Sequence, residues 1–316
     1  TVQSIVEKHL AAGLEACGAL EGGTAVVMDV NTGAIIALST KGDYDPNDPF
    51  TISEEAEAEI PDIVEEGVQK ALEEEEQELN TLQLAADAAE TDEERAQARQ
   101  ELDAYDRLTS EEIADLRVTL EDEAYAAAQN KQWRNKAVSD TYYPGSVFKM
   151  ITGSMALEEN IVTEETTYTC TGQWDFGNGI DPISCWNHSG HGLETFVDGI
   201  CNSCNPYMIW LGQQLGRQTF FNYFEAFGFT EHTGIDLPGE ADSLYYDVDG
   251  LNVVELATES FGQNFSITPI QMITAICAVA CSRTWWTASS TTTATSSRRP
   301  TRATSGRSFP RMFRPA

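Results

Sequence analysis

Positively charged side chains are scarce in this 316-residue sequence. It contains 19 Lys and Arg against 51 Asp and Glu, which gives a formal net charge of −32 at pH 7. Nucleic acids and anionic membrane surfaces carry phosphate charge of the same sign and would repel such a chain. We therefore expect no nucleic-acid partner.

Long hydrophobic runs are also missing. No apolar run reaches the roughly 18 residues that a transmembrane helix needs, and the first residues lack the pattern of a signal peptide. Residues 1–10 instead have the apolar spacing of an amphipathic helix. We therefore expect the sequence to be a fragment that starts inside a domain.

The acidic residues are concentrated in one part of the chain. Residues 51–130 contain 26 Asp and Glu against 5 Lys and Arg, and they are rich in Ala, Glu and Gln. Such a composition predicts one or two long helices, broken near Thr91-Asp92 or near Leu108-Thr109-Ser110. We interpret 53–129 as an acidic helical insertion that faces water, and a docking arm for a partner is the alternative.

Two β-rich runs precede this insertion. Residues 24–30 and 34–39 are joined by Asn31-Thr32-Gly33, a typical turn sequence. This pattern predicts a β-hairpin that follows the first helix.

The stretch around Ser146 has the form of a helix start that could carry a nucleophile. The turn pair Pro144-Gly145 comes first, and an apolar-periodic run follows over 147–151, which predicts a helix beginning at Ser146. Lys149 then lies on the same face, where a desolvated amine could accept the hydroxyl proton of Ser146. The unpaired N–H groups of the first turn would favour an oxyanion. Taken alone, Ser-x-x-Lys more often belongs to an ordinary capped surface helix.

A second short motif, Ser203-x-Asn205, precedes a predicted helix over 207–215, and a further helix is predicted over 220–227. With Ser146-x-x-Lys149 it resembles the motifs of penicillin-binding transpeptidase domains, in particular class B penicillin-binding proteins of the penicillin-binding protein 2 type. The other matching segments are Val26–Leu38, Tyr44–Asn47, Trp133–Ala137, Tyr143–Ser146, Thr233–Glu240, Gly262–Gln263 and Thr268–Met272.

The resemblance implies a fold and a domain organisation. The fold would be α/β (α+β), an antiparallel sheet flanked by helices. Residues 1–52 would start the transpeptidase domain, 53–129 would be the insertion, and 130–281 would form the domain core that carries the motifs.

The resemblance also implies a role for each motif residue. Ser146 would attack the carbonyl between the last two D-alanines of a peptidoglycan stem peptide, and Lys149 would take its proton. Ser203 would relay a proton toward the leaving amine, and Asn205 would hold the substrate amide. The amine of a neighbouring stem peptide would resolve the acyl-enzyme into a cross-link, β-lactam antibiotics would acylate Ser146 in the same way, and catalysis would need no cofactor.

The family further implies a place and a partner in the cell. The domain would work in elongation or sporulation at the outer face of the bacterial cytoplasmic membrane, through an anchor outside this sequence. A cell-wall synthesis protein such as a glycosyltransferase would be its partner.

The C-terminal part departs from the family pattern. The third motif, Lys-Thr/Ser-Gly, which supplies half of the oxyanion hole, does not occur after Gly262. Residues 282–316 form an aberrant basic low-complexity tail, with seven Arg and no acidic residue. A frameshift would produce such a tail, and a natural disordered tail is the alternative. We therefore expect the last strands of the sheet to be missing.

These departures keep two other functions open. One is a non-catalytic penicillin-sensing or scaffold domain. The other is a serine β-lactamase, for which the sequence offers no assignable water-activating carboxylate.

Cysteines cluster near the second motif and predict a structural zinc site. The expected ligands are Cys170, Cys185, His191 and Cys204. The resemblance supports this set, because some penicillin-binding protein 2 enzymes have a metal site with similar spacing. Cys204 is the middle residue of Ser203-x-Asn205, so a metal would brace that motif. A disulfide between the first two cysteines stays an alternative, and Cys201 and His188 are alternative ligands.

Overall fold

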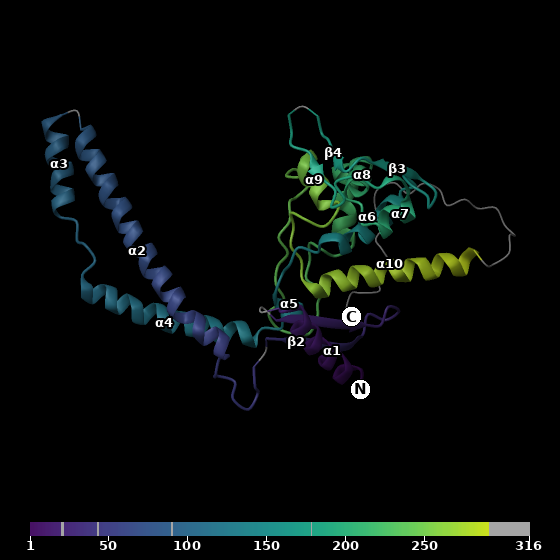
Figure 1. The fold of residues 1–316 in the computed structure, drawn as a ribbon, viewed down its shortest axis with the longest axis horizontal. Helices are drawn as coiled ribbons and strands as arrows, with labels where there is room; N and C mark the ends of the chain where they lie inside the picture. The colour runs from purple at the N-terminus through teal and green to yellow at the C-terminus, as the bar shows by residue number, and fades with distance from the viewer. Residues whose placement is uncertain (20–21, 43, 90, 178, 291–316) are drawn as a thin grey trace. The chain divides into compact units, whose positions relative to one another are not determined.

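The computed structural model describes residues 1–19, 22–42, 44–89, 91–177 and 179–290 (Figure 1). The chain divides into two compact units. One contains Thr1–Lys41 and the chain from Asn135 onward, and the other is Gly42–Arg134. The predicted insertion over 53–129 falls inside the second unit. Among helices in the described ranges, none combines the length and hydrophobicity needed to cross a lipid bilayer.

The first unit begins with a helix and the predicted hairpin. Helix α1 (Val2–Cys17) is followed by strands β1 (Gly23–Met28) and β2 (Ile35–Lys41), which pair antiparallel with Val26 opposite Leu38. The side-chain amide of Gln3 in α1 donates to the carbonyl of Leu38 at 2.8 Å and accepts from its N–H at 3.0 Å. Gln3 therefore satisfies backbone groups of β2 as a neighbouring strand would.

Four short strands lie between Thr167 and Thr195. Strand β3 (Thr167–Cys170) pairs antiparallel with β6 (Gly192–Thr195), and β4 (Gln173–Trp174) pairs with β5 (Ile183–Ser184). The pairings bring together residues as far apart in the sequence as Thr167 and Thr195, which local propensity cannot reveal. The mixed α and β fold is confirmed, and all three described sheets are two-stranded and antiparallel.

Helices form the rest of the first unit. They are α5 (Lys136–Ser139), α6 (Lys149–Glu158), α7 (Phe196–Cys201), α8 (Asn205–Ala226), α9 (Val253–Glu259) and α10 (Pro269–Ser290). The two helices predicted over 207–215 and 220–227 are parts of α8, which is interrupted by Gly216 with φ 71° and ψ 156°. Helix α10 continues past Ala280, and residues 291–316 of the predicted tail lie outside the described residues.

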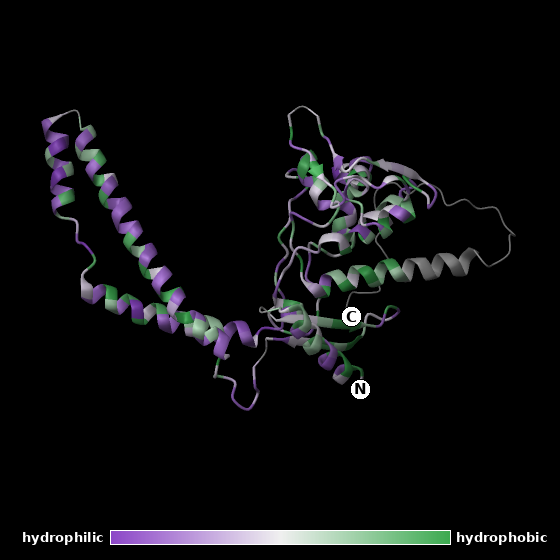
Figure 2. Ribbon diagram, in the orientation of Figure 1, coloured by the Kyte–Doolittle hydropathy of each residue, from purple (hydrophilic) through white to green (hydrophobic). Residues whose placement is uncertain are grey.

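An aromatic cluster holds the helices around the predicted nucleophile. Phe148 is fully buried, and its ring lies 4.8–6.3 Å, centroid to centroid, from those of Phe220, Phe224, Phe229 and Phe265. Figure 2 shows the same hydrophobic character in the first half of α10. Phe148 thus anchors the short segment that also carries the candidate site residues Ser146 and Lys149.

The second unit is a helical arm with two breaks. Its helices are α2 (Glu54–Ala88), α3 (Asp92–Asp103) and α4 (Ser110–Trp133). The sequence predicted one or two helices broken at one of two places, whereas the structure is broken at both. Thr91 and Thr109 each form a capping box, with Glu94 and Glu112 respectively, so each starts a new helix.

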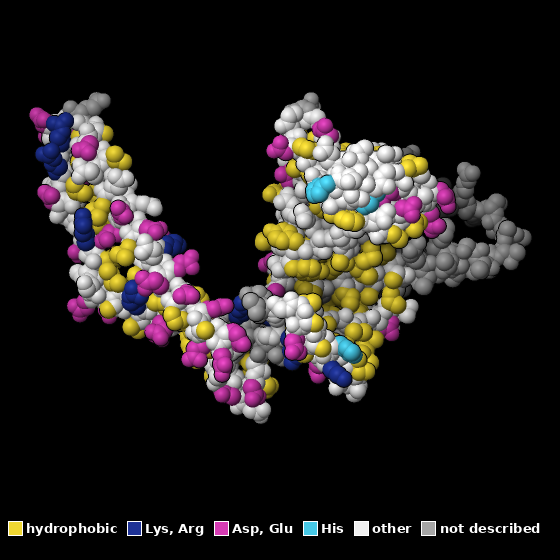
Figure 3. Space-filling model, in the orientation of Figure 1, with side chains coloured by type: hydrophobic (Ala, Val, Ile, Leu, Met, Phe, Trp, Pro, Cys, Tyr) yellow, Lys and Arg dark blue, Asp and Glu magenta, His cyan; other side chains and the backbone are white. Residues whose placement is uncertain are grey.

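A narrow apolar seam joins α2 to α4. It is formed by Ile60 and Val64 of α2 and Ala124 of α4, with Ile52 just before α2. Figure 3 shows many Asp and Glu side chains on the face of this unit that is in view. An ion pair between Arg117 of α4 and Glu65 of α2, at 2.6 Å, joins the same two helices beside the seam.

Replacing Phe148 is expected to destabilise the first unit strongly. Phe148→Ala removes a fully buried ring that contacts four others, so the free energy of unfolding should fall by about 3–5 kcal/mol in urea denaturation. Val147→Ala is the matched control, because the side chain of Val147 is 45% exposed and should cost less than about 1 kcal/mol. Equal losses in the two variants would show that the aromatic cluster does not hold this unit.

Candidate functional site

Ser146 lies in a single turn of 3₁₀ helix. The turn covers Gly145–Phe148 and runs directly into α6 at Lys149. The sequence predicted a helix beginning at Ser146. A helix begins at Gly145, but its first turn is 3₁₀ and the α-helix starts only at Lys149. Gly145 adopts φ 55°, and its N–H donates to the carbonyl of Gly262 at 2.8 Å. This contact with a distant segment tightens the first turn, and no local pattern reveals it.

Lys149 is buried and points at the second motif. Lys149 is 2% exposed. Its Nζ donates to the carbonyl of Ser203 at 2.7 Å, to Ser203 Oγ at 2.9 Å and to Asn205 Oδ1 at 2.6 Å. The direct Ser146–Lys149 hydrogen bond expected from their spacing is not formed. All three donor positions of the ammonium are taken by the second motif instead.

Ser203 lies between the predicted nucleophile and the lysine. Ser203 Oγ donates to Ser146 Oγ at 2.9 Å and accepts from Lys149 Nζ at 2.9 Å. The four predicted site residues are therefore brought together, with Ser203 as the link and Asn205 beside the amine. The sequence paired the residues within each motif, and the tertiary structure joins one motif to the other.

The backbone holds Ser203 in an unusual conformation. Ser203 has φ 51°, in the left-handed region that non-glycine residues rarely adopt, and it stands between α7 and the first residue of α8. The residue before it is fixed twice. Trp186 Nε1 donates to the carbonyl of Asn202 at 2.9 Å, and Asn202 Nδ2 donates to Glu194 Oε1 at 2.9 Å.

Burial changes the basicity of Lys149. Loss of hydration lowers the pKa of the Lys149 amine to about 8, while the Cys185 and Cys204 thiols act in the opposite direction. A substantial fraction of the amine is thus neutral near pH 8, although its ordinary value of 10.5 would keep it charged. A neutral amine hydrogen-bonded to a serine hydroxyl can act as a general base.

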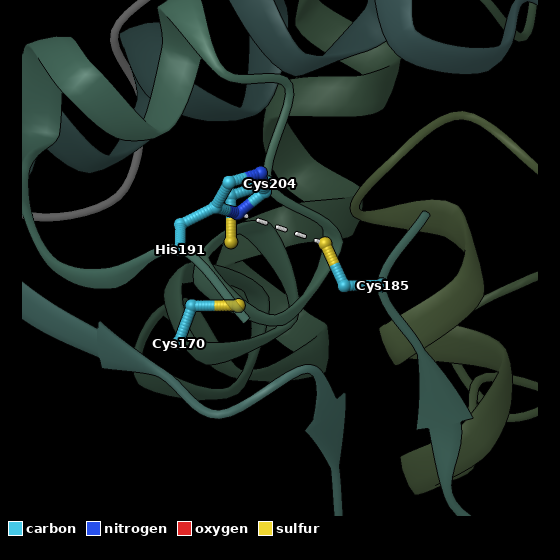
Figure 4. A group of neighbouring side chains, drawn as sticks. All are labelled: Cys170, Cys185, His191 and Cys204. Carbon is cyan, nitrogen blue, oxygen red and sulfur yellow. Dashed lines mark hydrogen bonds between the residues drawn. The ribbon is translucent and has the colours of Figure 1, made fainter. Parts of the chain in front are cut away.

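Three thiols and one imidazole meet directly behind the second motif (Figure 4). Cys170 ends β3, Cys185 follows β5, His191 precedes β6, and Cys204 caps α8. One donor atom from each lies within 4.8 Å of the others, and His191 Nδ1 is 3.8 Å from Cys185 Sγ. The spacing and donor types fit a tetrahedral zinc ion, whose sulfur ligands lie at about 2.3 Å from the metal.

Neither of the two alternative ligands belongs to this group. Cys201, an alternative ligand, is exposed and is not part of this group, and neither is His188. Cys170 and Cys185, the pair considered for a disulfide, are free thiols in the structure.

Sequence reasoning missed the buried Glu194 and its partner Asn202. Glu194 is 2% exposed, and besides accepting from Asn202 it lies 3.7 Å from His191 Nδ1. It thus connects the cysteine and histidine group to the loop that carries Ser203. A lone Glu on a four-residue strand gives no periodic signal that could have revealed this role.

The chain matches a family model described as the penicillin binding protein transpeptidase domain, over residues 23–284. Among curated proteins it is 41% identical over 157 residues to stage V sporulation protein D of Bacillus subtilis, which covers 49% of this chain and 24% of that protein. It is 31% identical over 155 residues to peptidoglycan D,D-transpeptidase MrdA of Acinetobacter baumannii, covering 46% and 23%. The chain thus spans about a quarter of these relatives' length.

Solved structures share the fold. One is a putative peptidoglycan glycosyltransferase from Atopobium parvulum, with a TM-score of 0.56 and 21% identity over 88% of this chain and 46% of that chain. Another is the TP domain of penicillin-binding protein 3 from Burkholderia pseudomallei, with a TM-score of 0.55 and 19% identity over 88% and 55%.

The lowered pKa of Lys149 should appear in the pH dependence of the free energy of unfolding. Between about pH 8 and pH 10.5 the unfolded chain keeps this lysine protonated while the folded chain releases the proton, so stability rises with pH in this window. Relative to Lys149→Met, the free energy of unfolding of the native chain should increase there by on the order of 3 kcal/mol. Urea denaturation at a series of pH values measures it.

The exposed Lys70 supplies the control for this measurement. Its side chain is 76% exposed, so Lys70→Met should follow the native chain at every pH. Parallel curves for the native chain and Lys149→Met would contradict the assignment of a perturbed amine.

Proposed function

The chain belongs to the penicillin binding protein transpeptidase domain family, and we propose on that premise that it carries the acyl-transfer site of a peptidoglycan D,D-transpeptidase. The observation that supports this function most directly is the chain of contacts from Ser146 Oγ through Ser203 Oγ to the buried Lys149 Nζ, with both steps at 2.9 Å. It connects a nucleophile to a base whose pKa burial has lowered to about 8.

In the first step Ser146 Oγ attacks the carbonyl between the last two D-alanines of a stem peptide. Because hydroxyl hydrogens rotate, the bond between the two serines can reverse direction. The Ser146 proton then passes to Ser203, and the Ser203 proton passes to neutral Lys149. The tetrahedral intermediate collapses, the carbon–nitrogen bond breaks, and the leaving D-alanine amine takes a proton back through Ser203. An acyl ester on Ser146 remains.

In the second step the amine of a neighbouring stem peptide attacks that ester. The same relay removes the proton of the attacking amine and returns one to Ser146, so the products are a cross-link and a free serine. Asn205 would hold the substrate amide. Its Oδ1 accepts from Lys149 and its Nδ2 donates to the carbonyl of Ser184 at 3.4 Å, and these two contacts fix the orientation of its side chain. A β-lactam ring would acylate Ser146 by the first step.

Covalent labelling tests this proposal. The full chain incubated with a fluorescent penicillin should gain a stable label that Ser146→Ala abolishes. Ser203→Ala and Lys149→Ala should lower the labelling rate about 10²–10⁴-fold, because each removes a step of proton transfer.

Ser154→Ala is the matched control for labelling. Ser154 lies on α6, and its hydroxyl donates to the carbonyl of Ile151, away from the relay, so this variant should label at the native rate. Hydrolytic turnover of the penicillin would indicate a serine β-lactamase instead. A native chain that takes no label would contradict the proposal and favour a non-catalytic scaffold.

We also propose that Cys170, Cys185, His191 and Cys204 hold a structural zinc ion. Four donor atoms within 4.8 Å of one another support this, as does the burial of all three cysteines. When bound, the ion would link the four segments that carry these residues. Cys204 would thereby hold the backbone between Ser203 and Asn205 in place.

Metal analysis of the purified protein tests the zinc proposal. The native chain should contain about one zinc, and Cys185→Ser should lose it and melt roughly 5 °C lower or more. Cys201→Ser is the control, because Cys201 is exposed and outside the group, so it should retain both the metal and the melting temperature. A Cys170–Cys185 disulfide found by mass spectrometry in metal-free native protein would overturn the site.

The setting in the cell is a further part of this proposal. We infer that the domain works on peptidoglycan at the outer face of the cytoplasmic membrane, in elongation or sporulation, with a glycosyltransferase as partner. The resemblance to a sporulation protein and to an MrdA transpeptidase supports this setting.

A further inference from the structure

A buried acid outside the relay lies at the end of α9. Glu259 is 2% exposed, and its Oε1 has no hydrogen-bond partner among the described residues. Glu255, one helical turn earlier, also has a buried oxygen without a partner. An ionised carboxylate is strongly disfavoured in such surroundings, whereas a neutral acid is tolerated.

Among the described residues, no Lys or Arg side chain lowers the pKa of Glu259. Burial raises this pKa to about 8, the backbone N–H of Tyr246 acts in the opposite direction, and the charge of Glu255 on the same helix raises it further. Two other helices donate to carbonyls close to Glu259 along the chain, Gln213 of α8 to Val253 and Thr152 of α6 to Ser260.

The residues that follow Glu259 reach the backbone beside Ser146. The N–H of Gly262 donates to the carbonyl of Glu259 at 2.9 Å, and the carbonyl of Gly262 accepts from the N–H of Gly145 at 2.8 Å. Gly262 has φ 88°, and a Cβ there would overlap the carbonyl group of Gly145. Two glycines thus touch backbone to backbone directly before the nucleophile.

The same segment is tied to the catalytic helix. Thr152 lies one turn after Lys149 on α6 and is fully buried, and its Oγ1 donates to the carbonyl of Ser260 at 2.8 Å. Ser260 is fully buried against Gly212 of α8. The segment from Glu259 to Gly262 is therefore held by α6 and α8 as well as by Gly145.

We propose that Glu259 is a positioning residue, which as a neutral acid holds the Glu259–Gly262 segment against Gly145 and so sets the place of Ser146. When Glu259 ionises, the carboxylate is drawn toward water and the Gly145–Gly262 hydrogen bond weakens. The effect of Glu259 on the reactivity of Ser146 rests on the proposed function. Its effect on the Gly145–Gly262 hydrogen bond does not.

Amide hydrogen exchange tests the contact without any measure of activity. In the full chain, the peptide that contains the Gly145 amide is followed by mass spectrometry at about pH 6 and about pH 9, in the native protein and in Glu259→Gln. At one pH this peptide has the same intrinsic exchange rate in both chains, so the ratio of the native rate to the Glu259→Gln rate reports protection alone. We expect the two chains to exchange equally fast at pH 6, and the native chain to exchange roughly tenfold faster than Glu259→Gln at pH 9. Equal rates at both would overturn the proposal.

Glu255→Gln is the matched control on the same helix. It removes a carboxylate that is not joined to Gly262, so the native loss of protection should persist and begin at a lower pH, because a like charge near Glu259 is gone. If Glu255→Gln abolished the pH effect as Glu259→Gln does, the effect would belong to charge on α9 in general, and the proposal would fail.

The pH profile of penicillin labelling provides the second readout. It should be bell-shaped in the native chain, because Lys149 must lose its proton and Glu259 must keep its own, and Glu259→Gln should lose only the falling limb. An unchanged falling limb would overturn the role of Glu259. A native chain that never labels would contradict the proposed function, and the exchange experiment would still decide whether Glu259 sets the contact.

Discussion

The burial of the Lys149 amine among Ser203 and Asn205 is the constraint on which the rest of the site depends. An ammonium group removed from water is stable only if its donors are satisfied, and here three oxygens within 2.9 Å of Nζ meet that need. The loss of hydration still lowers the pKa of the amine to about 8. The same arrangement that makes the lysine acceptable to the interior therefore makes it usable as a base.

This constraint explains why so much of the first unit is devoted to one loop. The carbonyl of Ser203 must face the amine, and a left-handed φ of 51° at Ser203 accompanies this arrangement. Such a conformation persists only where the surroundings fix it. Glu194 and Trp186 hydrogen-bond to Asn202, the residue before Ser203. The residue after Ser203 is Cys204, a member of the cysteine and histidine group. The cysteine-rich segment thus supports the site although none of its side chains belongs to the relay.

A contact between two backbone segments helps to fix the position of the nucleophile. Gly145 and Gly262 approach each other more closely than any side chain permits, so the position of Ser146 depends on a segment far along the chain. The aromatic ring of Phe148 anchors the turn from below. Ser146 is thus held by this backbone contact and by the packing of Phe148, in addition to its hydrogen bond with Ser203.

The sequence by itself predicted the hairpin and the acidic helical segment, because turn residues and apolar periodicity act locally. The mixed fold and the roles of Ser146, Lys149, Ser203 and Asn205 came from the resemblance of the two motifs and their surrounding segments to a known family. Only the tertiary structure decided that Lys149 bonds to Ser203 rather than to Ser146 and that the first turn is 3₁₀. The buried acids at Glu194 and Glu259 likewise became visible only in the fold. These features depend on which distant segments exclude water together, and burial of that kind has no local signature in a sequence.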